Sequence, residues 1–128
     1  MRAHRKRILV TVVTAVAAAS LATVAMAGPA AAPSKRPVKT VLVKDSFFKP
    51  KVARVTPGTK VTWAWKGDDH TVTFRTRPAG VGAIKGTGLR DTGARFSHVF
   101  HTKGTYRYVC RVHVDLGMTG RVVVQSRP

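Results

Sequence analysis

Cysteine is nearly absent from the 128-residue sequence, which contains only Cys110. A chain with one cysteine cannot form an intramolecular disulfide, so a small fold stapled by disulfides is excluded. In an exported protein a lone cysteine is an intermolecular partner, a reactive thiol or a metal ligand, and a buried apolar thiol is the common alternative. Coordination to a metal would protect such a thiol in an oxidising compartment.

Acidic residues are also scarce. There is no Glu, and five Asp face 23 Lys and Arg, which gives a formal net charge of +18. This balance indicates an acidic partner, an anionic envelope surface or nucleic acid, with a merely solvated basic surface as the alternative. Nucleic acid is disfavoured because the basic residues are spread over the whole chain, with no groove-binding helix and no stacking motif. We therefore expect an acidic protein partner or an anionic cell-envelope surface.

The N-terminus has the pattern of an export signal. Four of the first seven residues are basic, and residues 8–27 carry no charge and are rich in Ala and Val. Ala25-Met26-Ala27 fits a small-x-small cleavage site, which predicts a signal peptide over residues 1–27 and a mature start at Gly28. The alternative is an uncleaved membrane anchor. Both place the domain outside the cytoplasm, and removal of the four basic residues leaves a net charge of about +14.

A β domain is expected after a linker. Residues 28–39 hold three prolines and few large apolar side chains, which is typical of an extended or disordered linker. The domain is predicted over 40–128, without any helical period. Residues 61–65 alternate like a half-buried strand, and residues 75–93 are expected to form a long glycine-rich loop with at most one short edge strand. Short strands separated by turn signals, over about ninety residues, predict an all-β fold, a Greek-key β-sandwich of two sheets.

The chemistry is concentrated in the stretch V-C-R-V-H-V-D-L-G-M-T-G. It holds Cys110, His113 and Met118, and Met118 is the sole methionine beyond residue 27. A second imidazole is available from His70 in D-D-H-T-V-T-F. One thiolate, two imidazoles and a weak thioether suit copper, because a trigonal His₂Cys set with a long axial Met is the blue-copper arrangement. Taken singly, each residue could instead be a buried core or strand-end side chain.

The expected strands bring these side chains to one end of the sandwich. Cys110 is predicted to end a strand on its inward face, and His70 to begin a central strand. Gly117 and Gly120 flank Met118 and are expected to let the backbone bend tightly there. Two further histidines lie three apart on one strand, point to opposite faces and are predicted to be structural or surface residues: His98 and His101.

These motifs resemble the cupredoxins, in particular the plastocyanin-like small blue (type 1) copper proteins. The family's C-x-x-H-x-x-x-x-M pattern falls on Cys110, His113 and Met118, and its first ligand histidine falls on His70. The run F-F-K-P…P-G-T-K-V-T-W resembles the family's opening strands, so the resemblance covers residues 40–125. It implies a Greek-key sandwich, one copper ion that alternates between Cu(I) and Cu(II), and one-electron transfer.

The resemblance also implies a function. The expectation is an exported, monomeric electron carrier with a redox protein partner, and not an enzyme, because no open coordination position is implied. Electrons would leave at the His113 edge, which Val114 and Leu116 flank, since Val109 replaces the exposed Tyr of plant plastocyanins. Thr71 replaces the family's Asn, and its hydroxyl can do part of the same bracing work. The alternatives are an envelope protein that buffers or delivers copper, and a metal-free adhesion sandwich.

Overall fold

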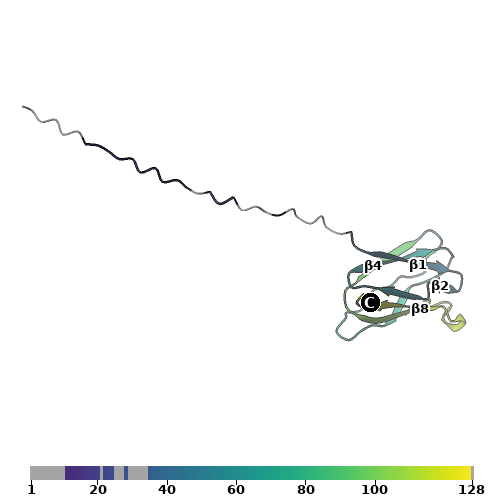
Figure 1. Cartoon of the computed structure of the whole chain (residues 1–128). Helices are drawn as coiled ribbons and strands as arrows, with labels where there is room; N and C mark the ends of the chain where they lie inside the picture. Colours follow the sequence, from purple (N-terminus) through teal and green to yellow (C-terminus); the bar gives the residue numbers. More distant parts are fainter. Residues whose placement is uncertain (1–10, 21, 25–27, 29–34, 128) are drawn as a thin grey trace, which may run out of the picture. The chain divides into compact units, whose positions relative to one another are not determined.

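The computed structural model describes residues 11–20, 22–24, 28 and 35–127 (Figure 1). Residues 11–20 and 22–24 are exposed and have no regular secondary structure. Within the described ranges, no helix has the length and apolar character needed to cross a membrane. The basic start of the expected signal and its Ala25–Ala27 cleavage motif lie outside the described residues, as does half of the expected linker, residues 29–34. The boundaries of signal, linker and domain therefore stay predictions.

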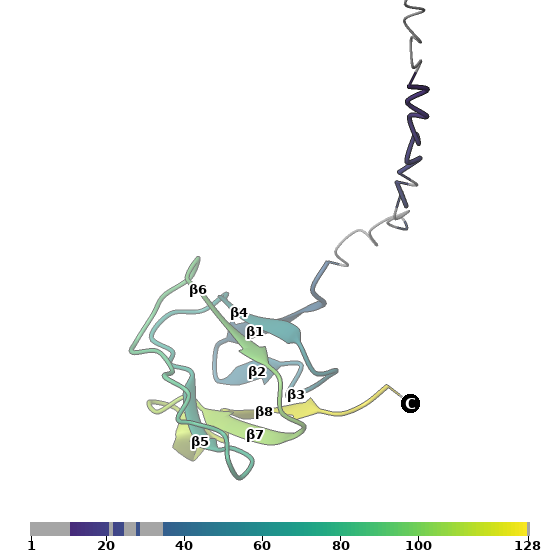
Figure 2. The same ribbon diagram turned by 90° about the vertical axis from the view of Figure 1, so that its left-hand side faces the viewer.

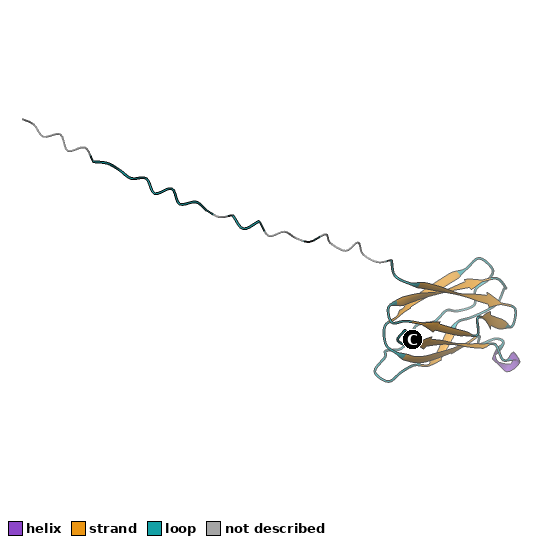
Figure 3. Cartoon of the chain, viewed as in Figure 1, coloured by secondary structure: helices purple, strands orange, loops and turns teal. Residues whose placement is uncertain are grey.

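Two four-stranded sheets form the domain, in the orders β2-β1-β4-β6 and β3-β8-β7-β5. Figure 2 shows them as two layers, with β6, β4 and β1 in one and β5, β7 and β8 in the other. The elements are β1 (Val38–Lys44), β2 (Phe47–Lys49), β3 (Val52–Val55), β4 (Thr59–Trp65), β5 (Thr73–Thr76), β6 (Arg95–Phe100), β7 (Gly104–Val109), the 3-10 turn η1 (Val114–Leu116) and β8 (Thr119–Val124). The predicted all-β sandwich is confirmed, and η1 is the one helical segment among residues 35–127 (Figure 3).

Strand β4 lies inside its sheet, between β1 and β6. The prediction of a half-buried strand is wrong here, because every residue from Val61 to Trp65 is buried. Its neighbours cover the outward-facing side chains as well, and Thr62 Oγ1 lies 2.9 Å from Ser97 Oγ on β6. A period of two shows which side chains share a face, but adjacent strands decide whether the second face meets water.

Aromatic side chains fill the space between the sheets. The Trp63 ring packs against Phe74, Phe100 and Tyr108 at centroid distances of 5.8, 6.3 and 5.3 Å. Edge-to-face pairs of this kind add about 0.5–1.5 kcal/mol each beyond the area they bury. Cys110 comes directly after Val109, the last residue of β7, and is buried like Tyr108 two positions before it, so the predicted inward direction of the thiol is confirmed.

His70 does not begin a central strand, and that prediction is wrong. Strand β5 starts at Thr73 and lies at the edge of its sheet, while His70 forms an isolated bridge with Arg90. His70, Thr71 and Val72 are all buried, so the side chains here do not alternate between core and solvent. The glycine-rich loop is confirmed beyond β5, and its residue Thr87 bonds to Val72 in both directions.

Candidate metal centre

The segment between β7 and β8 folds back on itself and buries Met118. The Cys110 amide donates to the Met118 carbonyl at 3.0 Å, and the Met118 amide donates to the His113 carbonyl at 3.2 Å. Gly117 has a φ of 75°, in the left-handed region that glycine adopts without steric cost, and its amide closes the turn on Val114. The predicted tight bend at Gly117 is therefore confirmed, and Met118 is fully buried beside the Cys110 backbone.

Gly120 has a different role from the one predicted. It lies within β8 and not in the turn. A Cβ atom at this position would stand only 2.5 Å from Cζ of Tyr108. Glycine is needed here because the aromatic ring passes close to the backbone, so Gly120 helps to seat Tyr108 beneath the site.

The backbone of His70 is fixed from several sides. Its amide donates to the Arg90 carbonyl at 3.1 Å, and its carbonyl accepts from the Arg90 amide at 3.0 Å. The same carbonyl accepts from Nε1 of Trp65 at 2.9 Å. The imidazole is 2% exposed, so both its position and its direction are set before any metal binds.

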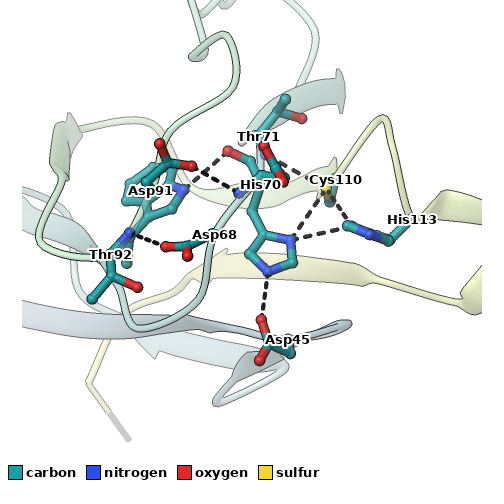
Figure 4. Close-up of polar contacts among 10 residues, drawn as sticks. Asp45, Asp68, His70, Thr71, Asp91, Thr92, Cys110 and His113 are labelled. Atoms are coloured by element: carbon teal, nitrogen blue, oxygen red, sulfur yellow. Dashed lines mark hydrogen bonds and ion pairs between the residues drawn. The ribbon is translucent and has the colours of Figure 1, made fainter.

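Three donor atoms converge at this end of the sandwich (Figure 4). Nδ1 of His70 lies 3.2 Å from Nδ1 of His113, and Sγ of Cys110 lies 3.8 Å and 3.5 Å from the two nitrogens. The point equidistant from the three atoms is about 2.0 Å from each, close to a metal–imidazole bond and slightly short of a metal–thiolate bond of about 2.3 Å. The three residues fit a trigonally bound ion with little rearrangement.

The donor set selects the kind of metal. Neither Mg²⁺ nor Ca²⁺ prefers a thiolate with two imidazoles, since both take oxygen ligands. A soft thiolate in a trigonal His₂Cys set, with a buried thioether nearby, suits copper. Met118 is completely buried, and its backbone bonds to both Cys110 and His113, so this residue adjoins the three donors. The structure thus brings the four residues predicted from the sequence into one place.

Thr71 ties the His70 segment to the Cys110 loop. Its amide points at Sγ of Cys110 at 3.5 Å, and its Oγ1 accepts a 2.9 Å hydrogen bond from the amide of Arg111. The Thr71 hydroxyl thus makes the predicted bracing contact to the ligand loop, where the family has an Asn side chain. The N–H directed at sulfur stabilises negative charge on the thiolate, and hydrogen bonds to that sulfur tune the potential of such sites.

The other two histidines of the domain lie elsewhere. His98 is in β6 and half-buried, and His101 follows that strand and is exposed. Burial lowers the pKa of His98, and the charge of His101 adds to the effect. In the described part of the chain, the group of possible metal ligands comprises His70, Cys110 and His113, and it does not include His98 or His101.

Sequence reasoning missed Asp45. Its carboxylate lies 3.2 Å from Nε2 of His70, on the side of the ring opposite the thiolate (Figure 4). The two residues are 25 positions apart, on different segments, and no local motif connects them. Only the folded chain shows that this acid touches the centre.

A two-sheet sandwich that gathers two imidazoles, a thiolate and a buried thioether at one end defines the class of small blue copper proteins. Residues 39–125 match the model of the copper-binding plastocyanin/azurin family. The chain belongs to this family, and its cofactor is copper.

Individual relatives agree with this assignment. The chain is 35% identical to the chloroplastic plastocyanin of Tetradesmus obliquus, over 84% of its own length and 80% of the plastocyanin. It is 33% identical to a halocyanin of Natronomonas pharaonis over 61% of its length, and the match spans about half of the halocyanin, 48%. Among solved structures, a pseudoazurin from Sinorhizobium superposes with a TM-score of 0.61 at 27% identity, covering 70% of this chain and 75% of that one.

Proposed function

We propose that this protein is an exported electron carrier that passes single electrons between redox partners. Copper would be held by His70, Cys110 and His113, with Met118 as the weak axial ligand. The observation that carries the proposal is the convergence of Nδ1, Sγ and Nδ1 within 3.2–3.8 Å of one another at one end of the sandwich. When bound, copper supplies a one-electron couple that takes an electron from a donor protein and gives it to an acceptor.

The chain's part is to hold one geometry for both oxidation states. Hydrogen bonds from Cys110 to Met118, from Met118 to His113 and from Arg111 to Thr71 tie the ligand loop to itself and to the neighbouring segment. Fixed ligands leave little to reorganise when charge changes, which favours rapid electron transfer. This rigidity supports a carrier over an enzyme or a protein that delivers copper.

The surface above His113 suits contact with a partner. His113 is half-buried, whereas His70, Cys110 and Met118 are almost completely buried. The apolar side chains of Val112, Val114 and Leu116 are 55%, 37% and 68% exposed on the same loop. Exposed apolar side chains on one loop favour a docking surface there. The excess of basic residues elsewhere favours an acidic redox protein, which would be steered by charge and seated at this edge.

A direct test starts from the colour of the copper-loaded domain. The parent should show the intense absorption of a Cu–thiolate bond, and Cys110→Ser should abolish it while weak Cu(II) binding through the histidines persists. His101→Ala is the control, because this exposed histidine lies outside the donor group. A Ser variant as blue as the parent would refute the ligand set, and a colourless parent would refute the function.

Export is tested separately on the full chain. The small-x-small motif before Gly28 supports cleavage by a signal peptidase. When the full chain is expressed in a bacterium, the protein should be found outside the cytoplasm, and its mass should correspond to a start at Gly28. A full-length mass in the membrane fraction would show an uncleaved anchor instead, and a full-length soluble cytoplasmic product would refute export.

A further inference from the structure

Asp45 is a surface residue that contacts His70, one of the residues of the metal centre. Its side chain is 85% exposed, yet Oδ1 lies 3.2 Å from Nε2 of His70, which is 2% exposed. In Figure 4 the ring of His70 presents Nδ1 to Cys110 and His113, and Nε2 to Asp45. A carboxylate only accepts hydrogen bonds, so this contact requires the proton on Nε2 and leaves the lone pair of Nδ1 facing the centre.

The turn that carries Asp45 contains one residue in a sparsely populated backbone conformation. Lys44 pairs with Phe47, so Asp45 and Ser46 alone connect β1 to β2. Ser46 has a φ of 63°, the left-handed region in which a residue other than glycine is uncommon. Such a conformation costs of order 1–3 kcal/mol and persists where the surroundings impose it, often at functional sites.

Gly67 leaves the space in which the two side chains meet. A Cβ at this position would overlap with Oδ1 of Asp45 and stand 3.0 Å from Nε2 of His70. The backbone of Gly67 is not in the left-handed region, so conformation alone does not demand glycine there. What demands it is the Asp45–His70 pair directly beneath. Two segments, the β1–β2 turn and the loop that holds Gly67 and His70, thus meet at one hydrogen bond.

We propose that Asp45 is a positioning residue that fixes the metal-facing tautomer of His70 and lowers the reduction potential of the bound copper. The proposal rests on the ligand set proposed above. A carboxylate behind a ligating imidazole orients the ring and makes its other nitrogen a stronger donor. Its negative charge also favours the ion of higher charge, so Cu(II) gains more than Cu(I).

Asp45→Asn tests this, because the amide keeps the shape and removes the charge. Loss of such a partner typically costs 10–100-fold in metal affinity. We expect the ratio of Cu(II) to Cu(I) affinity to fall by about tenfold, which for a one-electron couple raises the potential by about 59 mV. The blue absorption should remain. In the diamagnetic Cu(I) form, the slowly exchanging Nε2–H signal of His70 should be seen in the parent and should shift in the variant.

Three further variants separate positioning from general charge. Asp69→Asn removes an equal charge from the residue before His70 and leaves the Asp45 contact intact. Asp45→Glu keeps the carboxylate, so its reduction potential should stay close to that of the parent. Gly67→Ala should raise the potential by displacing Asp45, and it should add less in the Asp45→Asn background than alone, because the carboxylate is already absent there.

The outcomes are distinct. A rise confined to Asp45→Asn and Gly67→Ala, with a shifted His70 signal, supports the proposal. Equal rises for Asp45→Asn and Asp69→Asn would overturn it in favour of long-range charge. An unchanged potential in a blue Asp45→Asn protein would also overturn it while the proposed function stands. A parent that binds no copper or lacks the blue band would refute the proposed function itself.

Discussion

Removal of the Thr71 hydroxyl should loosen the ligand loop. Thr71→Val keeps the shape of the side chain but leaves the Arg111 amide without its 2.9 Å acceptor. An unpaired buried donor costs about 1–3 kcal/mol. Thr71 is 3% exposed, but Arg111 itself is exposed and water can reach part of its backbone. We therefore expect the free energy of unfolding to fall by about 1–2 kcal/mol, which lowers Tm by about 4–16 °C in a domain of this size.

Thermal unfolding of the apo protein, followed by circular dichroism, measures this loss directly. Thr71→Ser keeps the acceptor oxygen and should recover most of it. Thr73→Val is the matched control, because Thr73 is half-buried and its Oγ1 lies 3.1 Å from Oγ1 of Thr71 without touching the ligand loop amide. Equal Tm values for Thr71→Val and Thr73→Val would refute the idea that Thr71 braces the centre.

Three further predictions concern the axial position, the core and the charge. Met118→Leu should raise the reduction potential, because Cu(II) loses a donor, and Met118→Gln should lower it, because an amide oxygen favours Cu(II); voltammetry that finds no movement in either variant would exclude Met118 as a ligand. Burial raises the pKa of Tyr108 to about 12. The folded state then holds a proton that the unfolded chain loses near pH 10, so stability should decline between about pH 10 and 12 by at most about 2–3 kcal/mol; Tyr108→Phe should flatten that decline in denaturant titrations, and an unchanged slope would contradict it. Electron-transfer rates with an acidic partner should fall steeply between low and physiological salt, as the screening length shortens to about 8 Å, whereas a flat profile would leave the basic surface without a role in docking.

The chemistry of the centre was readable from the sequence because its ligands are few in kind and mostly local. Cys110, His113 and Met118 lie within nine residues, and one turn can bring them together wherever the loop is placed. Thiolate, imidazole and thioether also differ enough in softness to indicate the metal without coordinates. The all-β architecture followed equally directly, since alternation and turn residues are properties of short segments.

Tertiary structure decided what surrounds those segments. The sequence placed His70 at the start of a central strand, but its pairing with Arg90 and the burial of Thr71 override the local alternation. Nothing in the sequence indicated that Asp45 belongs to the site, because an acidic residue in a surface turn is common. Only the fold brings its carboxylate to 3.2 Å from the ligand His70. Periodicity records how a residue faces its own strand, whereas its neighbours across the sandwich are fixed by long-range packing, and these neighbours determine how the copper ligands are held.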